Sequence, residues 1–469
     1  MLSADVLYST VRELGRDLRA KKFTSVQLTA AYLDRLSRLG PQLNAVVTVT
    51  SDLALEQARQ ADQELAAGHP CGPLHGIPYG AKDLLATKGI KTTWGCRAYA
   101  QQVPGDDATI IKRLREAGAV LVAKLAMVEL AGGAGYRYAS ASLTGPGLNP
   151  WNTGRWAGGS SSGSGAAVAA GLVGFAIGSD TWGSIVTPAG LCGVSGLRPT
   201  YGRASRHGAM ALSWSMDKLG PLARSVEDCA LVLAAISGLD PADPTSAGEP
   251  FVAPTRASKP SLRGREIGFI REDFAQFGEP EVEQAYNQAL DTLRSLGAKL
   301  EQVKLPEFPY DAVAGTIVAA EAAAAFEELI RAGHTEEIVD PEGRVGLYAA
   351  RLISAADYLK CLRIRALIQN ALANLFGQSE VLVAPSLLIV APPIEANLDE
   401  VFKGGGEIEA AGNLAGLPAL SVPCGFGRDH LPAGLQIVGK AFDEKTVLEV
   451  GRAFQAATSW HRERPPLKG

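Results

Sequence analysis

Residues 158–171 read GGSSSGSGAAVAAG, a run of glycine and serine that passes directly into an apolar stretch. Such a composition is typical of a flexible linker, which usually joins domains and continues as polar sequence. Here the chain continues instead as AAVAAGLVGFAIGSDT, which is apolar enough for a core. Glycines let the backbone approach a reacting group closely, and small hydroxyls beside them donate and accept protons. The context therefore favours a buried functional loop over a linker.

A second candidate segment follows at 178–190, with the sequence GSDTWGSIVTPAG. A Gly-Ser pair after the end of a strand can expose the hydroxyl of Ser184 on a tight turn. The backbone amides around this turn could then form an oxyanion hole. These amides belong to Thr181, Trp182, Gly183 and Ser184. Taken alone, the segment fits an ordinary loop better, and it lacks the second glycine of a G-x-S-x-G elbow.

The third candidate is Lys82, which follows an apolar segment in the sequence IPYGAKDLL. A single lysine is nearly always a solvated surface charge. A lysine placed directly after a buried strand, in a turn that contains glycine, is a better candidate for a buried amine. Histidine is the usual base for a nucleophilic serine, but His75 and His207 lie outside the two unusual segments. We interpret both histidines as structural or peripheral.

Composition and charge limit the classes of protein to consider. The chain has 469 residues, 46% hydrophobic and 20% charged, which is ordinary for a globular protein. A net charge of −4 gives no support to a surface for nucleic acid or anionic membrane. The six cysteines show no C-x-x-C spacing and do not cluster with histidine, so no zinc site is expected. With no signal peptide and no run of ~18 apolar residues, we expect a cytoplasmic protein.

Helices and buried strands alternate along the chain. Residues 107–125 give a helix, a glycine and then the strand AVLVAKL, an order typical of parallel α/β sheets. Thr24 and Gln27 predict a capping box for a helix ending near Gly40. Further strands are expected near 266–270, 299–304, 381–384, 419–423 and 434–438, and helices near 51–68, 279–296, 315–332, 355–375 and 443–456. We predict one large α/β domain with a mixed, mostly parallel central sheet covered on both faces by helices.

The three candidate segments together resemble the amidase-signature family. The family pattern places a lysine after a strand, then GGSS(S/G)G, then a D-T-x-G-S turn. The separation of 24 positions between Ser160 and Ser184 also matches the family. Further similar segments are NPWN at 149–152, GLRPTYGRASRHG at 196–208 and NLAGLPALSVPCG at 413–425. The resemblance covers most of the chain.

The resemblance implies how the chain is organised. It gives a single amidase-signature domain over 1–469, densest in a catalytic core at 70–245. N-terminal helices at 1–68 precede this core. A variable portion at 246–405 is expected on the substrate side, and 406–469 returns to the core.

By position, the resemblance implies that Ser184 is the nucleophile and that Lys82 is the base. Ser160, reached through a cis peptide from Gly159, is the implied bridge between them. Ser184 would attack a carbonyl while its proton passes through Ser160 to Lys82, with no metal or cofactor. Lys82 must be neutral for this, so burial should lower its pKa from ~10.4.

Further residues are expected to support these three. Asp180 is expected to hold the turn by hydrogen bonding, and Ser161 and Gly159 are expected beside the relay. The chain departs from the family at two positions, with Trp182 and Val186 where glycine and arginine are common. These departures leave the chemistry in place but weaken any substrate assignment copied from other members.

Two functions remain open. The main hypothesis is a stand-alone, metal-independent serine hydrolase that cleaves the C–N bonds of small amides, with aryl amides, carbamates or esters as further substrates. It would need no nucleic acid or membrane partner and would be a monomer or homodimer. The alternative is the glutaminase subunit of the glutamyl-tRNA amidotransferase, which segments 196–245 and 410–424 resemble. Two features argue against the alternative. One is the pair of departures at Trp182 and Val186, and the other is the sequence GGGEIEAAGN before Leu414, in a place where an acidic residue suited to glutamine is expected.

Overall fold

Four helices lie in the N-terminal part of the molecule; the sequence located the last two of them, and the strand β1 (Val46–Val49) interrupts the region predicted to be helical. The helices are α1 (Ala4–Leu7), α2 (Val11–Arg19), α3 (Ser25–Leu39) and α4 (Ser51–Ala66). The predicted capping box begins α3: the Thr24 hydroxyl accepts the N–H of Gln27, whose side chain accepts the N–H of Thr24. This arrangement satisfies backbone donors that have no partner inside the helix. The computed structural model describes residues 2–133, 135–254, 261–404 and 406–467.

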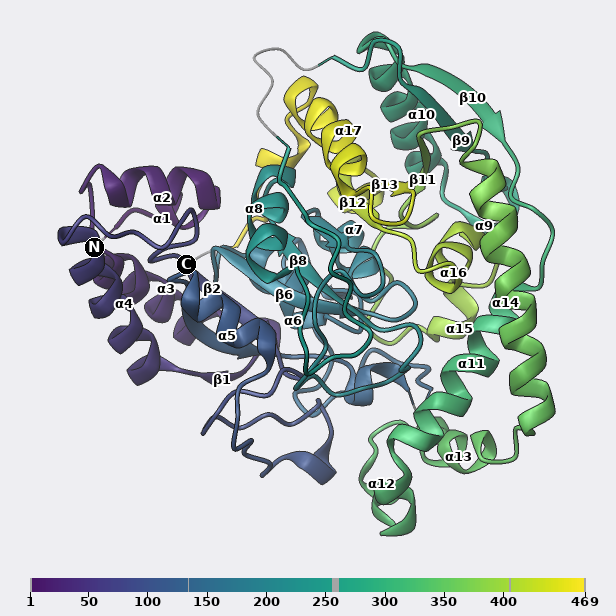
Figure 1. Ribbon diagram of the computed structural model, residues 1–469, viewed down its shortest axis with the longest axis horizontal. Helices are drawn as coiled ribbons and strands as arrows, with labels where there is room; N and C mark the ends of the chain where they lie inside the picture. Colours follow the sequence, from purple (N-terminus) through teal and green to yellow (C-terminus); the bar gives the residue numbers. More distant parts are fainter. Residues whose placement is uncertain (1, 134, 255–260, 405, 468–469) are drawn as a thin grey trace.

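An eleven-stranded sheet runs through the centre of the molecule (Figure 1). Its strands lie in the order β1-β3-β2-β6-β8-β7-β12-β13-β11-β9-β10. Their bounds are β1 (Val46–Val49), β2 (Pro78–Lys82), β3 (Val120–Leu125), β6 (Phe175–Asp180), β7 (Ser195–Arg198), β8 (Lys218–Ala223), β9 (Glu266–Ile270), β10 (Lys299–Val303), β11 (Val381–Pro385), β12 (Ala419–Phe426) and β13 (Pro432–Gly439). The short strands β4 (Leu148–Asn149) and β5 (Asn152–Trp156) form a separate ribbon.

The sheet is mixed, as predicted, but it is not mostly parallel. Parallel pairing is confined to two groups in the described residues, β3-β2-β6 and β11-β9-β10. The strands between these groups pair antiparallel, as does β1 with β3. The short connection at 427–431 explains one such pair: it joins β12 to β13 without the crossover that parallel strands require. The alternation of helix and strand predicted the parallel direction correctly only in these two groups.

Helices cover both faces of the sheet, which confirms the predicted architecture. On one face, α8 (Val226–Ile236), α10 (Pro280–Ser295) and α17 (Glu444–Ala457) enter the main core. On the other face, α6 (Ser162–Ala169) and α7 (Val186–Cys192) join a second buried cluster with α3 and α4. The remaining helices are α5 (Thr109–Glu116), α9 (Phe274–Phe277), α11 (Tyr310–Ala325), α12 (Glu327–Arg331), α13 (Pro341–Ala350), α14 (Ala355–Leu375), α15 (Leu398–Val401) and α16 (Glu407–Leu414). No helix among the described residues is both long and apolar enough to cross a membrane.

The glycines of the 158–171 run are required by packing. A Cβ on Gly163 would lie 2.4 Å from the carbonyl oxygen of Ala45, and one on Gly165 would lie 2.9 Å from that of Pro188. Helix α6 therefore approaches neighbouring backbone more closely than a side chain would permit. The run is a buried junction and not a linker.

Candidate active site

The amine of Lys82 lies at the end of β2 and is fully buried. Its hydrogen-bond partners are three serine hydroxyls, those of Ser160 at 2.8 Å, Ser161 at 2.9 Å and Ser179 at 2.8 Å. Strands β2 and β6 are parallel neighbours, with Ala81 opposite Ile177. Their carboxyl ends therefore meet at one edge of the sheet, which brings Lys82 next to Ser179.

A second hydrogen bond extends this arrangement to Ser184. The hydroxyls of Ser160 and Ser184 lie 2.9 Å apart, and the Gly159–Ser160 peptide is cis. Ser184 is half-buried in the turn before α7, whereas Ser160 is buried. The three side chains that the family resemblance selects thus form a continuous chain of hydrogen bonds from a buried amine to an accessible hydroxyl.

Burial lowers the pKa of Lys82 to about 7, while Asp180 and Asp217 oppose this by attracting the charged form. Within the described residues, no carboxylate oxygen lies within ion-pair distance of the Lys82 amine. The hydroxyl of Ser161 donates to the carbonyl oxygen of Ser179, so it must accept from Lys82. A neutral amine has two protons to donate and one lone pair, and three hydroxyl partners can satisfy it. The site is therefore compatible with a lysine that accepts a proton near neutral pH.

The carboxylate of Asp180 holds the turn that carries Ser184. It accepts the N–H of Gly183 at 2.9 Å, that of Ile185 at 2.7 Å and that of Val186 at 3.4 Å. Because Gly183 donates its amide to Asp180, that amide is not available to an oxyanion in this structure. In the described part of the chain, the amides of Thr181, Trp182 and Ser184 have no such partner.

A charge network behind this turn was not predicted from the sequence. The guanidinium of Arg198, on β7, lies 3.8 Å from Asp180 and forms a closer ion pair with Glu409 of α16. Glu409 also accepts hydrogen bonds from Asn413 at 2.7 Å and Gln436 at 2.6 Å. A Cβ on Gly183 would lie 3.3 Å from Cγ of Glu409, so the network touches the turn.

This network explains how the chain accommodates Val186 in place of the expected arginine. Val186 is buried in an apolar cluster with Val313 and Ile317 of α11. Arg198 supplies a guanidinium to Asp180 from another strand. Neither Arg198 nor Glu409 was selected from the sequence, because these two ion-pair partners are 211 positions apart in the chain. Arg198 lies in the family-like segment GLRPTYG, and Glu409 lies in EIEAAGN.

Trp182 lies at the surface beside Ser184 and is 38% exposed. A Cβ on Gly315 of α11 would contact the indole at 3.9 Å, so the ring faces that helix. Beside Ser179 and Thr181 there is a small hollow of about 30 Å³, whose wall also includes Leu84, Ala131 and Met210. This volume suits one or two molecules of the size of water or ammonia.

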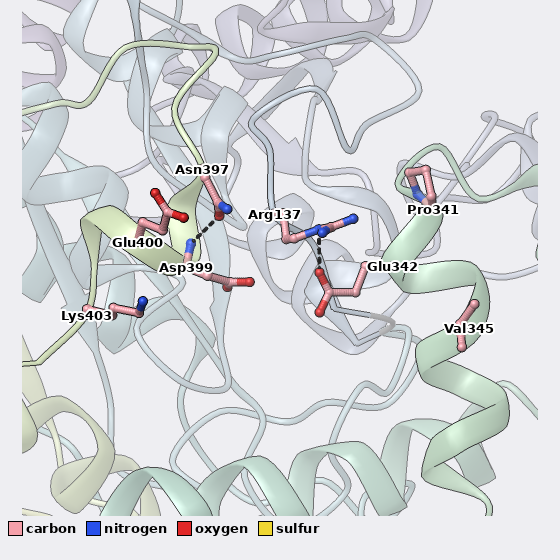
Figure 2. A pocket seen from close by; sticks show the side chains of 8 residues that line it. All are labelled: Arg137, Pro341, Glu342, Val345, Asn397, Asp399, Glu400 and Lys403. Atoms are coloured by element: carbon pink, nitrogen blue, oxygen red, sulfur yellow. Dashed lines mark hydrogen bonds and ion pairs between the residues drawn. The ribbon is translucent and has the colours of Figure 1, made fainter.

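A larger open pocket of about 530 Å³ lies further out (Figure 2). It separates Arg137 and Glu342, which form an ion pair at 2.6 Å, from Asp399 and Lys403 near α15. Arg137 follows Tyr136, whose ring packs edge-on against Trp156. A Cβ on Gly159 would lie 2.8 Å from the ring of Trp156, so this aromatic pair packs against the segment that carries Ser160.

The two histidines considered as bases make other contacts. The ring of His75 is buried and bonds the carbonyl oxygen of Ala61 and the N–H of Cys71. The ring of His207 contacts the Thr109 hydroxyl at 3.5 Å. In the described residues, neither ring has a hydrogen bond with Ser184.

Comparison with known proteins identifies relatives along nearly the whole chain. Residues 27–448 match the family model described as Amidase. The A subunit of the glutamyl-tRNA(Gln) amidotransferase of Moorella thermoacetica is 40% identical, covering 99% of both chains. The structure of the native peptide amidase from Stenotrophomonas maltophilia gives a TM-score of 0.85 at 34% identity, covering 98% of both chains. The amidotransferase A subunit of Thermotoga maritima gives 0.80 at 30%, covering 98% of this chain and 97% of that one.

These relatives correct one prediction from the sequence. We expected a monomer or homodimer with no nucleic-acid partner, and this expectation is wrong: relatives that match from end to end are named as one subunit of an enzyme that is itself named for a tRNA. The net charge tests only whether this chain's own surface is strongly basic, and one component of a larger assembly need not have such a surface. The match of the family model and of full-length relatives shows that the chain belongs to the amidase-signature family of amide-hydrolysing enzymes.

Proposed function

We propose that this protein is the amide-hydrolysing subunit of a tRNA-dependent amidotransferase and that it releases ammonia from glutamine. The observation that carries the proposal is the hydrogen-bonded chain from Lys82 through Ser160 to Ser184, in a sequence that matches amidotransferase relatives over their full length. The cytoplasmic location that we expect from the sequence of this protein stays a prediction.

In the proposed mechanism, Ser184 Oγ attacks the carboxamide carbon while its proton moves to Ser160. Ser160 simultaneously passes its own proton to the neutral amine of Lys82. The negative oxygen of the tetrahedral intermediate receives hydrogen bonds from amides of the turn. We assign this role to the unoccupied amides of Thr181, Trp182 and Ser184, because fixed donors stabilise charge as it develops.

Collapse of the intermediate returns the proton along the same chain to the leaving nitrogen. Ammonia departs and leaves an ester on Ser184, which water hydrolyses with Lys82 again accepting a proton through Ser160. The hollow of about 30 Å³ beside Ser179 and Thr181 suits ammonia or water. We assign this hollow to the ammonia released from a primary amide.

The open pocket of Figure 2 supports an amino-acid amide. Glutamine carries an ammonium and a carboxylate, so its recognition requires both signs of charge. The pocket presents cations at Arg137 and Lys403 and carboxylates at Asp399 and Glu400. We assign the charged end of the donor to this pocket. Arg137→Ala should then raise KM for glutamine and leave KM for acetamide unchanged.

The tagged chain should be recovered from its source organism and assayed for glutaminase activity with and without glutamyl-tRNA(Gln). We expect co-purifying subunits, ammonia release that increases with the tRNA, and loss of this release in Ser184→Ala. Recovery of the chain without partners, together with hydrolysis of simple amides but not glutamine, would contradict the proposal.

A second candidate function is direct hydrolysis of larger amides, carbamates or esters. The exposed indole of Trp182 beside Ser184 favours it, since an aromatic wall would suit a bulky acyl group. The similarity to the peptide amidase structure is also somewhat greater than that to the amidotransferase structure. Parallel assays on p-nitroanilides, aliphatic amides and aryl carbamates separate the candidates. Faster turnover of a bulky substrate than of glutamine would favour the second.

A further inference from the structure

A cluster of three metal-ligating side chains lies outside the active site, where the loop after α4 leads towards β2. Glu64 comes from the last turns of α4, and Cys71 and His75 come from the loop. The Sγ of Cys71 is 3.5 Å from Oε2 of Glu64, and Nδ1 of His75 is 3.7 Å from the same oxygen. All three potential ligand atoms lie within 4.8 Å of one another.

Two of these separations are close to those of a tetrahedral zinc site. Zinc bonds are about 2.3 Å to thiolate sulfur and 2.0–2.2 Å to imidazole nitrogen or carboxylate oxygen. A tetrahedral angle between such bonds places neighbouring ligand atoms about 3.3–3.6 Å apart. The two observed separations, 3.5 and 3.7 Å, are at or just above this range. The third separation, between Sγ of Cys71 and Nδ1 of His75, is at most 4.8 Å, so binding a cation requires this pair to approach and Nδ1 to release the N–H of Cys71.

The ring of His75 is oriented as in a metal ligand. Its Nε2 lies 2.9 Å from the carbonyl oxygen of Ala61, an acceptor that requires the proton on Nε2. The lone pair of Nδ1 then faces the cluster, where it now accepts the N–H of Cys71 at 3.1 Å. Metal-binding histidines usually donate their other nitrogen to a carbonyl or carboxylate in this way.

The space around Nδ1 depends on a glycine. A Cβ on Gly118 would lie 2.4 Å from Nδ1 of His75, and Gly118 has a positive φ of 76°. Cys71 is exposed and the side chain of Glu64 is 31% exposed, so an ion can enter from solvent. A thiolate and a carboxylate with a neutral imidazole would also balance the charge of a divalent cation.

We propose that Glu64, Cys71 and His75 bind a zinc-like divalent cation, with a fourth position left to water. The site is separate from the relay and from the proposed function, and no step of the proposed mechanism involves it. The thiol proton of Cys71 leaves to solvent when the ion binds. The sequence predicted the opposite, because Cys71 and His75 do not form a recognised zinc spacing and Glu64 comes from a preceding helix.

Cobalt(II) is the probe for the test, since its spectrum reports both geometry and thiolate ligation. The full chain is treated with chelator, dialysed and titrated with Co²⁺ and then with Zn²⁺. We expect one equivalent of Co²⁺ with strong visible bands of a four-coordinate ion and a near-ultraviolet thiolate band, both removed by Zn²⁺. Weak bands of a six-coordinate ion, or no stoichiometric binding, would overturn the proposal.

Variants at the exposed ligands avoid disturbing the core around His75. Cys71→Ser should abolish the thiolate band and weaken zinc binding by about 100-fold or more, and Glu64→Gln should weaken it by at least about tenfold. Cys361→Ser makes the same chemical change at a distant thiol and should leave the titration unchanged. A thiolate band that survives in Cys71→Ser, or disappears in Cys361→Ser, would assign the metal elsewhere and refute the site.

Discussion

Two buried lysines on neighbouring strands carry out different tasks in this molecule. Lys82 ends β2 and Lys124 lies on β3, where it is opposite Ala81. Both side chains are inaccessible to solvent. Lys124 has a carboxylate partner, Asp83, at 3.2 Å, and it also donates to the carbonyl oxygen of Leu85 at 2.8 Å. The amine of Lys82 has serine hydroxyls as partners instead.

The difference shows that burial alone does not make a lysine a base. Burial lowers the pKa of both lysines, but the adjacent carboxylate of Asp83 raises that of Lys124 back towards its ordinary value. The ion pair with Asp83 favours the charged form of the Lys124 amine, and a charged amine cannot accept a proton. The serine hydroxyls around Lys82 can form hydrogen bonds with its neutral amine. One of them, the hydroxyl of Ser160, also connects the amine to Ser184. The partners therefore separate a structural lysine from a proton acceptor.

Removing the relay should have the largest effect. Lys82→Ala and Ser184→Ala should each lower kcat by about 10⁴-fold or more, and the double variant should be no worse, because the groups act as a unit. Steady-state assays of ammonia release measure this, with unchanged circular dichroism as the control for folding. An active Ser184→Ala variant would refute the assignment of the nucleophile.

Removing Lys124 should affect stability instead. Lys124→Met leaves Asp83 buried without its partner and should cost about 3–5 kcal/mol in the free energy of unfolding. Urea unfolding measures the loss, and Lys82→Met is the matched control. Because Lys82 has no carboxylate partner among the described residues, its replacement should cost less. Equal destabilisation by the two substitutions would break the comparison between the lysines.

The pH dependence of the reaction should follow the protonation of Lys82. Its pKa is lowered to about 7, so the neutral, reactive amine predominates above that pH. We expect kcat/KM to rise about tenfold per pH unit below pH 7 and to level off above it. Asp217→Asn removes a charge that raises this pKa and should move the rise to lower pH. A profile that is flat through pH 7, or a shift to higher pH in Asp217→Asn, would exclude Lys82 as the titrating group.

Weakening the charge network should have a moderate effect. Glu409→Gln removes the charge that pairs with Arg198 behind the nucleophile turn, and we expect kcat to fall about tenfold, equivalent to ~1.4 kcal/mol, with little change in KM. Glu407→Gln, an exposed residue on the same helix, is the control. A fall in Glu407→Gln of the same size would show that α16 and not the ion pair is responsible.

Changing Trp182 should have the smallest effect on the relay itself. Trp182→Gly restores the residue common in the family, and we expect turnover of a small amide to change by less than about threefold, under 1 kcal/mol. The ratio of kcat/KM for bulky and small amides should change more, since Trp182 is exposed on the same turn, two residues before Ser184. A large loss of activity towards every substrate would show that Trp182 supports the turn and does not select substrates.

Side chains close together in the chain were enough to predict the local elements. The capping box at Thr24 and the strand before Lys82 depend on neighbouring residues, whose interactions need no knowledge of the rest of the fold. The helix near 355–375 and the strand near 266–270 were predicted for the same reason. Ser160, Ser184 and Lys82 were selected through the joint resemblance of three separate segments to the amidase-signature family, including the 24-position spacing of the two serines.

How these pieces meet could be learned only from the folded molecule. The antiparallel centre of the sheet, the donation of the Gly183 amide to Asp180, and the pairing of Arg198 with Glu409 depend on strand order and packing. The approach of Glu64 to Cys71 and His75 likewise depends on how the loop after α4 folds back. The residues in these contacts are not spaced at the period of a helix or a strand. The sequence therefore does not indicate which residues pair, and the folded structure does. For the same reason, the sequence identified the lysine of the relay but could not reveal that hydroxyls, and not a carboxylate, surround it.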